Sequence, residues 1–146
     1  IGALALNTPA SPTMSGPAAA DKTFLPAAKV AAAFARGAPL VETGGYKVHA
    51  SRREAPGMAE IHLRDTDIIY VLEGTSTLVT GGEVVDRKTV AEDEIRGTAI
   101  RSGEAQRLAK GDVVIVPRGV PHWFKEVQAP FLYYVVKATV PGGGTQ

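Results

Sequence analysis

Cysteine is absent from the 146-residue chain, which excludes disulfides, thiolate nucleophiles and zinc sites built on thiolates. Long apolar runs are absent as well, so no segment is expected to span a bilayer. Neither sign of charge dominates, because 16 basic residues oppose 15 acidic ones. Without a concentrated basic face, nucleic acid is not an expected partner. Hydrophobic residues make up 45% of the sequence, which is typical of one globular domain with a hydrophobic core.

The first 20 residues contain no charged side chain and are rich in Ala, Pro, Ser and Thr. Ala3-Leu-Ala5 and Ala18-Ala-Ala20 both fit the small-x-small pattern of signal peptidase sites. Two interpretations stay open: the remnant of an export signal, which would place the protein in the periplasm or outside the cell, or a low-complexity arm with incidental alanines. We assign residues 1–20 to this arm, 21–140 to a single domain and 141–146 to a flexible tail.

One short helix is predicted over Pro26–Arg36. Proline at the first helical position and glycine directly after the last one, Gly37, are the expected asymmetry of helix ends. Val30 and Phe34 are four residues apart and therefore lie on the same face. We expect this face to cover the rest of the domain.

From Leu40 onward the chain consists of short strand-like runs separated by Gly, Pro and Asp, a pattern that favours an antiparallel sandwich or barrel. Residues 88–94 are mostly charged and are predicted to form an exposed loop. The whole segment 82–110 is interpreted as an inserted hairpin plus loop, which either caps the barrel or forms a dimer contact. The predicted strands are Tyr46–Arg52, Ala59–Leu63, Ile68–Glu73, Ser76–Thr80, Glu83–Asp86, Thr98–Arg101, Ala105–Ala109, Val113–Val116, His122–Val127 and Phe131–Ala138.

Two motifs carry the functional information. The later one runs from Gly111 through Pro117 and Gly119 to His122, with the spacing Gly-x5-Pro-x-Gly-x2-His. A buried apolar strand is followed by a bend, because proline restricts φ and glycine accepts angles that other residues avoid. The earlier motif begins at Glu60-Ile-His62, passes Asp67 and continues as an apolar strand to Glu73-Gly74.

Together, in this order, the two motifs resemble those of the cupin family. The resemblance implies an all-β, cupin-like double-stranded β-helix (a jelly-roll barrel), here with one short N-terminal helix and an extended N-terminal arm. It implies four metal ligands: Glu60 and His62 at the family's two histidine positions, Asp67 at its glutamate position, and His122 from the second motif. It also implies a homodimer.

Strand geometry supports this ligand set. Side chains two apart on a strand project to the same face, so Glu60 and His62 project together. Two imidazoles with one or two carboxylates suit a divalent transition metal, namely Fe, Mn, Ni, Co or Zn. The alternative is a cupin that binds no metal. Two neighbouring buried carboxylates without a cation would be costly, which favours the metal.

Further residues are candidates for other roles. Glu60, if it is not a ligand, and His49 are candidate acid–base residues, although a lone strand histidine is more often at the surface. Ile69, Val71 and Phe124 are predicted to line the pocket. Alternation also places Glu126 on the face of His122 and Trp123 on the opposite face. Arg52 and Arg53 either bind an anionic substrate or end a strand in solvent.

The resemblance leaves the reaction open, because one fold serves many chemistries. The leading hypothesis is a metal-dependent enzyme, similar to a dioxygenase, isomerase or lyase, that acts on a small oxygenated organic compound. The competing hypotheses are a non-catalytic module that binds a small molecule and a structural cupin without chemistry.

Overall fold

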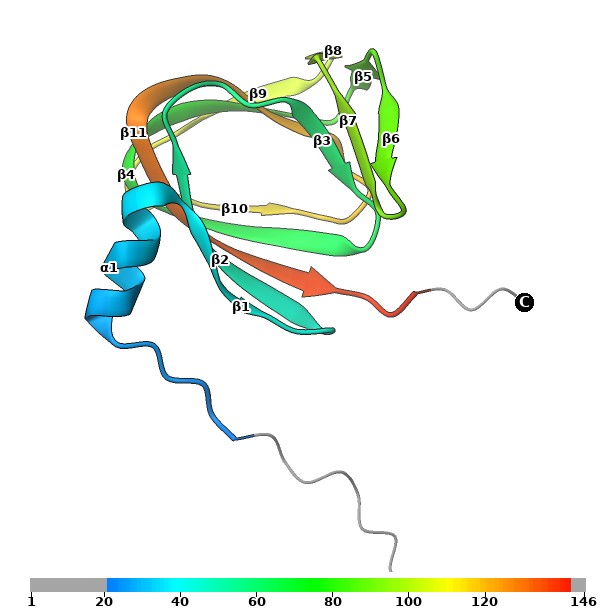
Figure 1. Cartoon of the computed structure of the whole chain (residues 1–146). Helices are drawn as coiled ribbons and strands as arrows, with labels where there is room; N and C mark the ends of the chain where they lie inside the picture. Colours follow the sequence, from blue (N-terminus) through cyan, green and yellow to red (C-terminus); the bar gives the residue numbers. More distant parts are fainter. Residues whose placement is uncertain (1–20, 143–146) are drawn as a thin grey trace, which may run out of the picture.

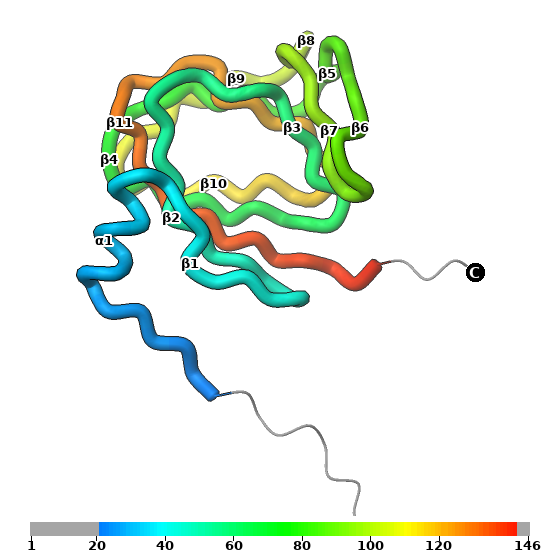
Figure 2. Tube along the Cα trace, in the orientation of Figure 1, coloured from blue at the N-terminus to red at the C-terminus, as the bar shows by residue number. Residues whose placement is uncertain are grey.

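The computed structural model describes residues 21–142, shown in Figures 1 and 2. The arm at 1–20 and the last four residues of the predicted tail lie outside the described residues. Within 21–142 the chain forms one helix followed by eleven strands. These are α1 (Ala27–Arg36), β1 (Ala38–Glu42), β2 (Tyr46–Arg53), β3 (Ala59–His62), β4 (Asp65–Thr80), β5 (Glu83–Val85), β6 (Lys88–Ala91), β7 (Glu94–Gly97), β8 (Ala99–Arg101), β9 (Glu104–Leu108), β10 (Val113–Val116) and β11 (His122–Thr139).

The predicted helix is confirmed. Pro26 directly precedes α1, and Gly37 ends it with a φ of 74° that favours glycine. Phe34 packs edge-on against Tyr134 of β11, with the ring centroids 4.9 Å apart. Val30 packs against the same cluster, which also contains Ala50 of β2. The helix therefore covers the outer face of the β2–β11 pair, as Figure 1 shows.

The two longest strands, β4 and β11, run antiparallel to each other and connect both halves of the molecule. In one half, β11 lies between β2 and β4, and β10 pairs with the far edge of β4. In the other half, β9 pairs with β4, while β3, β7 and β6 extend the sheet from the start of β11. The two halves face each other across a shared interior (Figure 1), which is the predicted all-β jelly roll.

Glycine bends β4 where it passes between the halves. Gly74 has a φ of 78°, and a Cβ at this position would collide with the backbone oxygen of Pro130. The sequence pattern predicts that one strand ends at Glu73 and another starts at Ser76, and it predicts a similar division of β11. Both divisions are wrong, because the chain bends here and pairing continues on either side.

The prediction of a loop at residues 88–94 is also wrong. This segment contains β6 and the start of β7, which pair with each other, and β7 also pairs with β3. None of residues 88–94 is buried, and the buried side chain of β7, Ile95, comes directly after them. The separate two-stranded sheet β5–β8 packs Val84 and Ile100 against Ile95 and Ile61, and thereby covers the outer face of β3 and β7. Strand β1 was not predicted either.

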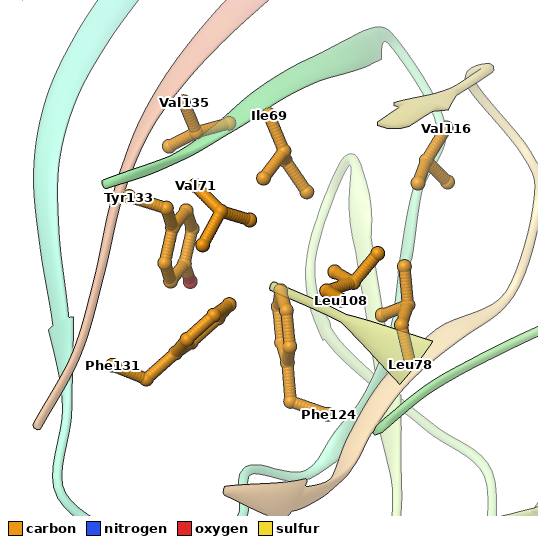
Figure 3. Close-up of a cluster of buried hydrophobic side chains, with 9 residues drawn as sticks. All are labelled: Ile69, Val71, Leu78, Leu108, Val116, Phe124, Phe131, Tyr133 and Val135. Atoms are coloured by element: carbon orange, nitrogen blue, oxygen red, sulfur yellow. The ribbon is translucent and has the colours of Figure 1, made fainter. Parts of the chain in front are cut away.

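Figure 3 shows the main core, whose side chains point toward one another in the interior. Its rings Phe124, Phe131 and Tyr133 have centroids 5.1–5.7 Å apart. The complete cluster comprises Ile69, Val71, Leu78, Leu108, Val116, Phe124, Phe131, Tyr133 and Val135. Between residues 21 and 142, no helix has the length and apolar character that crossing a membrane requires.

Candidate metal centre

The structure brings together the four side chains that the sequence analysis selected as metal ligands. Glu60 and His62 lie on β3, Asp67 near the start of β4, and His122 at the start of β11. Glu60 and His122 are directly paired across two neighbouring strands. The bend in β11 allows its later residues to pair with Asp67, so that one strand contacts both sides of the site.

Donor atoms of Glu60, His62 and His122 all lie within 4.8 Å of one another, and Asp67 approaches the two histidines. Nε2 of His62 and Nε2 of His122 both lie 3.8 Å from Oε2 of Glu60. Oδ2 of Asp67 lies 3.5 Å from Nε2 of His62 and 3.8 Å from Nε2 of His122. Two ligands that each bind one ion at about 2.1 Å are at most about 4.2 Å apart, so these separations fit a shared transition metal.

Hydrogen bonding directs His122 towards the site. Its Nδ1 lies 3.2 Å from the backbone oxygen of Val120. A carbonyl oxygen can only accept, so Nδ1 carries the proton and the lone pair of Nε2 faces Glu60 and Asp67. The ring is also buried, with 3% of the residue exposed. A histidine whose second nitrogen is bound in this way is oriented as metal ligands usually are.

The surroundings of His62 favour its neutral, metal-binding form. Burial lowers the pKa of its imidazole, and the positive charge of Lys137 and the neighbouring His122 lower it further. These effects outweigh the carboxylates of Asp67 and Glu60, which raise the pKa. His62 is therefore neutral at neutral pH and has a lone pair to offer.

Lys137 lies within the site, although no motif in the sequence predicts it. Its Nζ donates hydrogen bonds to both oxygens of Asp67, at 2.8 and 2.9 Å, and lies 3.2 Å from Nε2 of His62. Alternation along β11 from the core residue Val135 would have placed it inside. Neighbouring carboxylates therefore do not by themselves require a metal ion here, because this ammonium already neutralises one of them.

The four residues lie on the wall of a cavity of about 380 Å³, a volume typical of small-molecule sites. Ile69 and Phe124 are on its lining, as is His49, whose Nε2 lies 2.9 Å from Oε1 of Glu42. Val71 lies in the core cluster instead. The lining comprises Glu42, Lys47, His49, Ser51, Arg53, Glu60, His62, Asp65, Asp67, Ile69, Glu94, Arg96, His122, Phe124, Tyr133, Val135 and Lys137.

Glu126 does not share the face of His122. The pairing of β11 with β4 shifts by one residue between Phe124 and Glu126, which is a β-bulge. The bulge turns Glu126 to the outer face, where its carboxylate accepts a hydrogen bond from Thr77 at 3.3 Å. Strict alternation failed here because the sequence contains no signal for the extra residue.

Trp123 faces away from the cavity and ties the site to a neighbouring loop. Its indole Nε1 donates to the backbone oxygen of Gly57 at 2.9 Å. The ring also packs against the cluster that contains Ile61 and Ile95. The residue directly before it is His122, so this bond joins the β11 side of the site to the loop between β2 and β3.

The chain belongs to the cupin family, whose model matches residues 18–144. No curated protein matches the sequence. Among solved structures, a Bacillus halodurans protein, BH2720, is similar with a TM-score of 0.56 and 13% identity, over 86% of this chain and 87% of that one. A double-stranded β-helix protein of Klebsiella pneumoniae subsp. pneumoniae has a TM-score of 0.50 and 18% identity, over 72% of each chain.

The lyase DddQ from Ruegeria pomeroyi, described as a DMSP lyase, is similar with a TM-score of 0.51 and 16% identity. The similar region covers 74% of this chain but 48% of the lyase. At these identities the similarity establishes the fold alone.

Proposed function

We propose that this cupin is a metal-dependent enzyme that acts on a small oxygenated organic compound. One observation carries the proposal: donor atoms of Glu60, His62 and His122 lie within 4.8 Å of one another, on the wall of a cavity large enough for a small molecule. A DMSP lyase and a hydroquinone 1,2-dioxygenase have the same fold, and both activities are compatible with this chemistry. The reaction is of dioxygenase, isomerase or lyase type.

The donor set of two imidazoles and carboxylates suits Fe, Mn, Ni, Co or Zn. When bound, such an ion acts as a Lewis acid on a substrate oxygen. The proposed ligands are Glu60, His62, His122 and Asp67. Lys137 shares the lone pair of His62 Nε2 that the ion needs, so its ammonium must leave this contact when metal binds. We therefore interpret Lys137 as a cation that balances Asp67 until a divalent ion replaces it.

His49 is the proposed proton carrier. Its imidazole lines the cavity and contacts the carboxylate of Glu42, a pairing that orients a histidine for general acid–base work. Glu60 takes this role only if it is not a ligand. Replacing His49 should therefore reduce turnover and leave metal binding intact.

Metal analysis of the purified protein, combined with calorimetric titration of Co²⁺ and Zn²⁺, tests the site. His62→Ala and His122→Ala should each weaken metal binding at least about tenfold. His49→Ala is the matched control, because it removes the third histidine of the chain from the same cavity. Unchanged metal content in both ligand variants would contradict the proposal.

Lys137 favours a second candidate function, a metal-free module that binds a small molecule. In this alternative the Lys137–Asp67 ion pair is permanent, and the cavity holds a ligand without turnover. Thermal stabilisation by a ligand, without metal and without product, would support the module. Fe²⁺-dependent oxygen uptake with a panel of small acids and phenols would support an oxygenase.

We also propose a homodimer formed through the outer face of β4 and β10. Val113 and Ile115 of β10 are exposed and pair directly with the exposed Tyr70 and Ile68 of β4. Contiguous exposed apolar residues mark interaction surfaces. Ile115→Asp should therefore give monomers in light scattering, while Val90→Asp on the exposed strand β6 should not. A monomeric wild-type protein would contradict this assembly.

A further inference from the structure

Strand β2 presents a row of four polar side chains to the cavity: Lys47, His49, Ser51 and Arg53. Two of them are matched by an acid. Lys47 pairs with Asp65 at 3.0 Å, and His49 contacts Glu42 at 2.9 Å. Arg53, by contrast, forms no ion pair within residues 21–142. Its charge is available to a ligand.

The other cations on the lining are also matched. Lys137 pairs with Asp67 at 2.8 Å, and Arg96 pairs with Glu94 at 3.0 Å. Arg96 also lies 3.7 Å from Glu60. Arg53 is thus the one lysine or arginine on the lining without an acidic partner in the described part of the chain.

Neutral groups position the Arg53 guanidinium without cancelling its charge. Its Nε donates to the hydroxyl of Tyr133 at 3.0 Å, and its Cζ lies 4.5 Å from the centroid of the Phe124 ring. A Cβ at Gly57 would collide with Nη1, so the guanidinium also packs against the loop backbone at this position. Burial raises the pKa of Tyr133, and this phenol therefore remains neutral at neutral pH. The guanidinium of Arg53 is therefore held in place while its positive charge stays unpaired.

The position of Arg53 relative to the metal ligands limits the length of a ligand. Phe124 follows His122 by two residues on the same strand face, a separation of about 7 Å along the strand. A guanidinium stacked on Phe124 is therefore separated from the metal ligands by a few bonds of a small molecule. Phe124 and Val135 give the same cavity an apolar part of its wall.

We infer that Arg53 binds the carboxylate of the ligand, and that the ligand is a small hydroxy or oxo monocarboxylic acid whose second oxygen faces His62 and His122. A planar guanidinium binds a carboxylate through two parallel hydrogen bonds. A dianion such as phosphate is disfavoured, because Arg53 is the one unmatched lysine or arginine on the described lining and offers a single positive charge. The inference rests on the proposed function for the position of the second oxygen.

Calorimetry with 4-hydroxybenzoate and 4-oxopentanoate, each compared with its neutral amide and with inorganic phosphate, tests the inference. Wild-type protein should bind at least one acid at least about tenfold more tightly than its amide and than phosphate. Arg53→Gln should abolish this preference and leave metal content unchanged. Arg52→Gln is the matched control, since it makes the same change on the neighbouring residue, whose partner is Glu54 and which does not line this cavity.

Arg53→Lys keeps the positive charge but loses the planar guanidinium and its two parallel hydrogen bonds. It should therefore weaken acid binding less than Arg53→Gln does. It keeps the test valid if the glutamine variant does not fold. The inference is overturned if acid and amide bind wild type equally, if neither acid binds at millimolar concentration, or if the Arg53 variants bind acid as wild type does. Acid binding that depends on Arg53 in a protein without metal would support this subsite while contradicting the metal-dependent function.

Discussion

The two ends of the barrel interior differ sharply, although the same strands build both. At the closed end, Val71 of β4 and Phe131 of β11 are fully buried among apolar side chains. At the open end, Asp67 and Lys137 of the same two strands form an ion pair on the cavity wall. Along both strands, the side chains that point into the barrel thus change from apolar to charged over only a few positions. Packing at one end stabilises a barrel that can hold an unfavourable cluster of charges at the other.

The closed end should tolerate truncation least. Phe131→Ala is expected to lower the free energy of unfolding by about 4 kcal/mol, because it removes a ring with no exposed surface and leaves a cavity. Urea denaturation measures the loss. Leu63→Ala is the control, because this residue is exposed and its truncation should have almost no effect. A loss below about 1 kcal/mol for Phe131→Ala would mean that the closed end does not carry the stability of the fold.

The ion pair at the open end gives the next largest effect. Lys137→Met should cost about 3 kcal/mol in metal-free protein, because Asp67 is left buried without a cation. Added Zn²⁺ should then raise the melting temperature more than it does in wild type. Lys47→Met is a suitable comparison, since it removes the partner of the less enclosed Asp65. If metal-free K137M is as stable as wild type, Lys137 does not balance Asp67.

Asp65 makes the stability of the open end depend on pH. Burial opposes its ionisation, but hydrogen bonds from Thr139 and Lys47 outweigh burial and hold the pKa of Asp65 below its ordinary value. A lowered folded-state pKa adds stability above the unfolded pKa of about 3.9, and this stability is lost as the pH falls through the folded value. Asp65→Asn should therefore cost about 2 kcal/mol at pH 7. The difference should vanish in strong acid, and a constant difference at every pH would exclude this cause.

The smallest effect should come from outside the interior. Arg52 and Glu54 form an exposed ion pair, and Glu54→Gln should change the free energy of unfolding by less than about 0.5 kcal/mol. Denaturation at low and high salt measures this change. A larger loss here than at Asp65 would reverse the ranking of interior and surface charges.

Much of the fold could be predicted from local patterns. Pro26 and Gly37 delimit the helix, and the Pro117-x-Gly119 bend before His122 identifies the strand that follows. Residues 88–94 show no strand pattern, because none of them is buried and the buried Ile95 follows only after them. Gly74 does not mark a strand end, because a glycine with positive φ bends a strand as readily as it ends one.

The site was predictable only where motifs exist. Alternation along one strand predicts that Glu60 and His62 project together, and the Pro117-x-Gly119 bend identifies His122. Lys137 has no motif, and it lies 70 residues from Asp67 in sequence, so that strand pairing alone brings the two together. The importance of Arg53 likewise depends on three-dimensional pairing, because its lack of an acidic partner becomes visible only when the partners of every other cation on the lining are known.

The single tryptophan of the chain provides a built-in optical probe. Trp123 adjoins His122 and is bonded to the loop at Gly57, against which Arg53 packs. Its fluorescence emission should therefore respond to changes at His122 and at Arg53, although the indole itself does not line the cavity. Occupancy can be followed in unlabelled protein by fluorescence, with a signal that belongs to one indole alone.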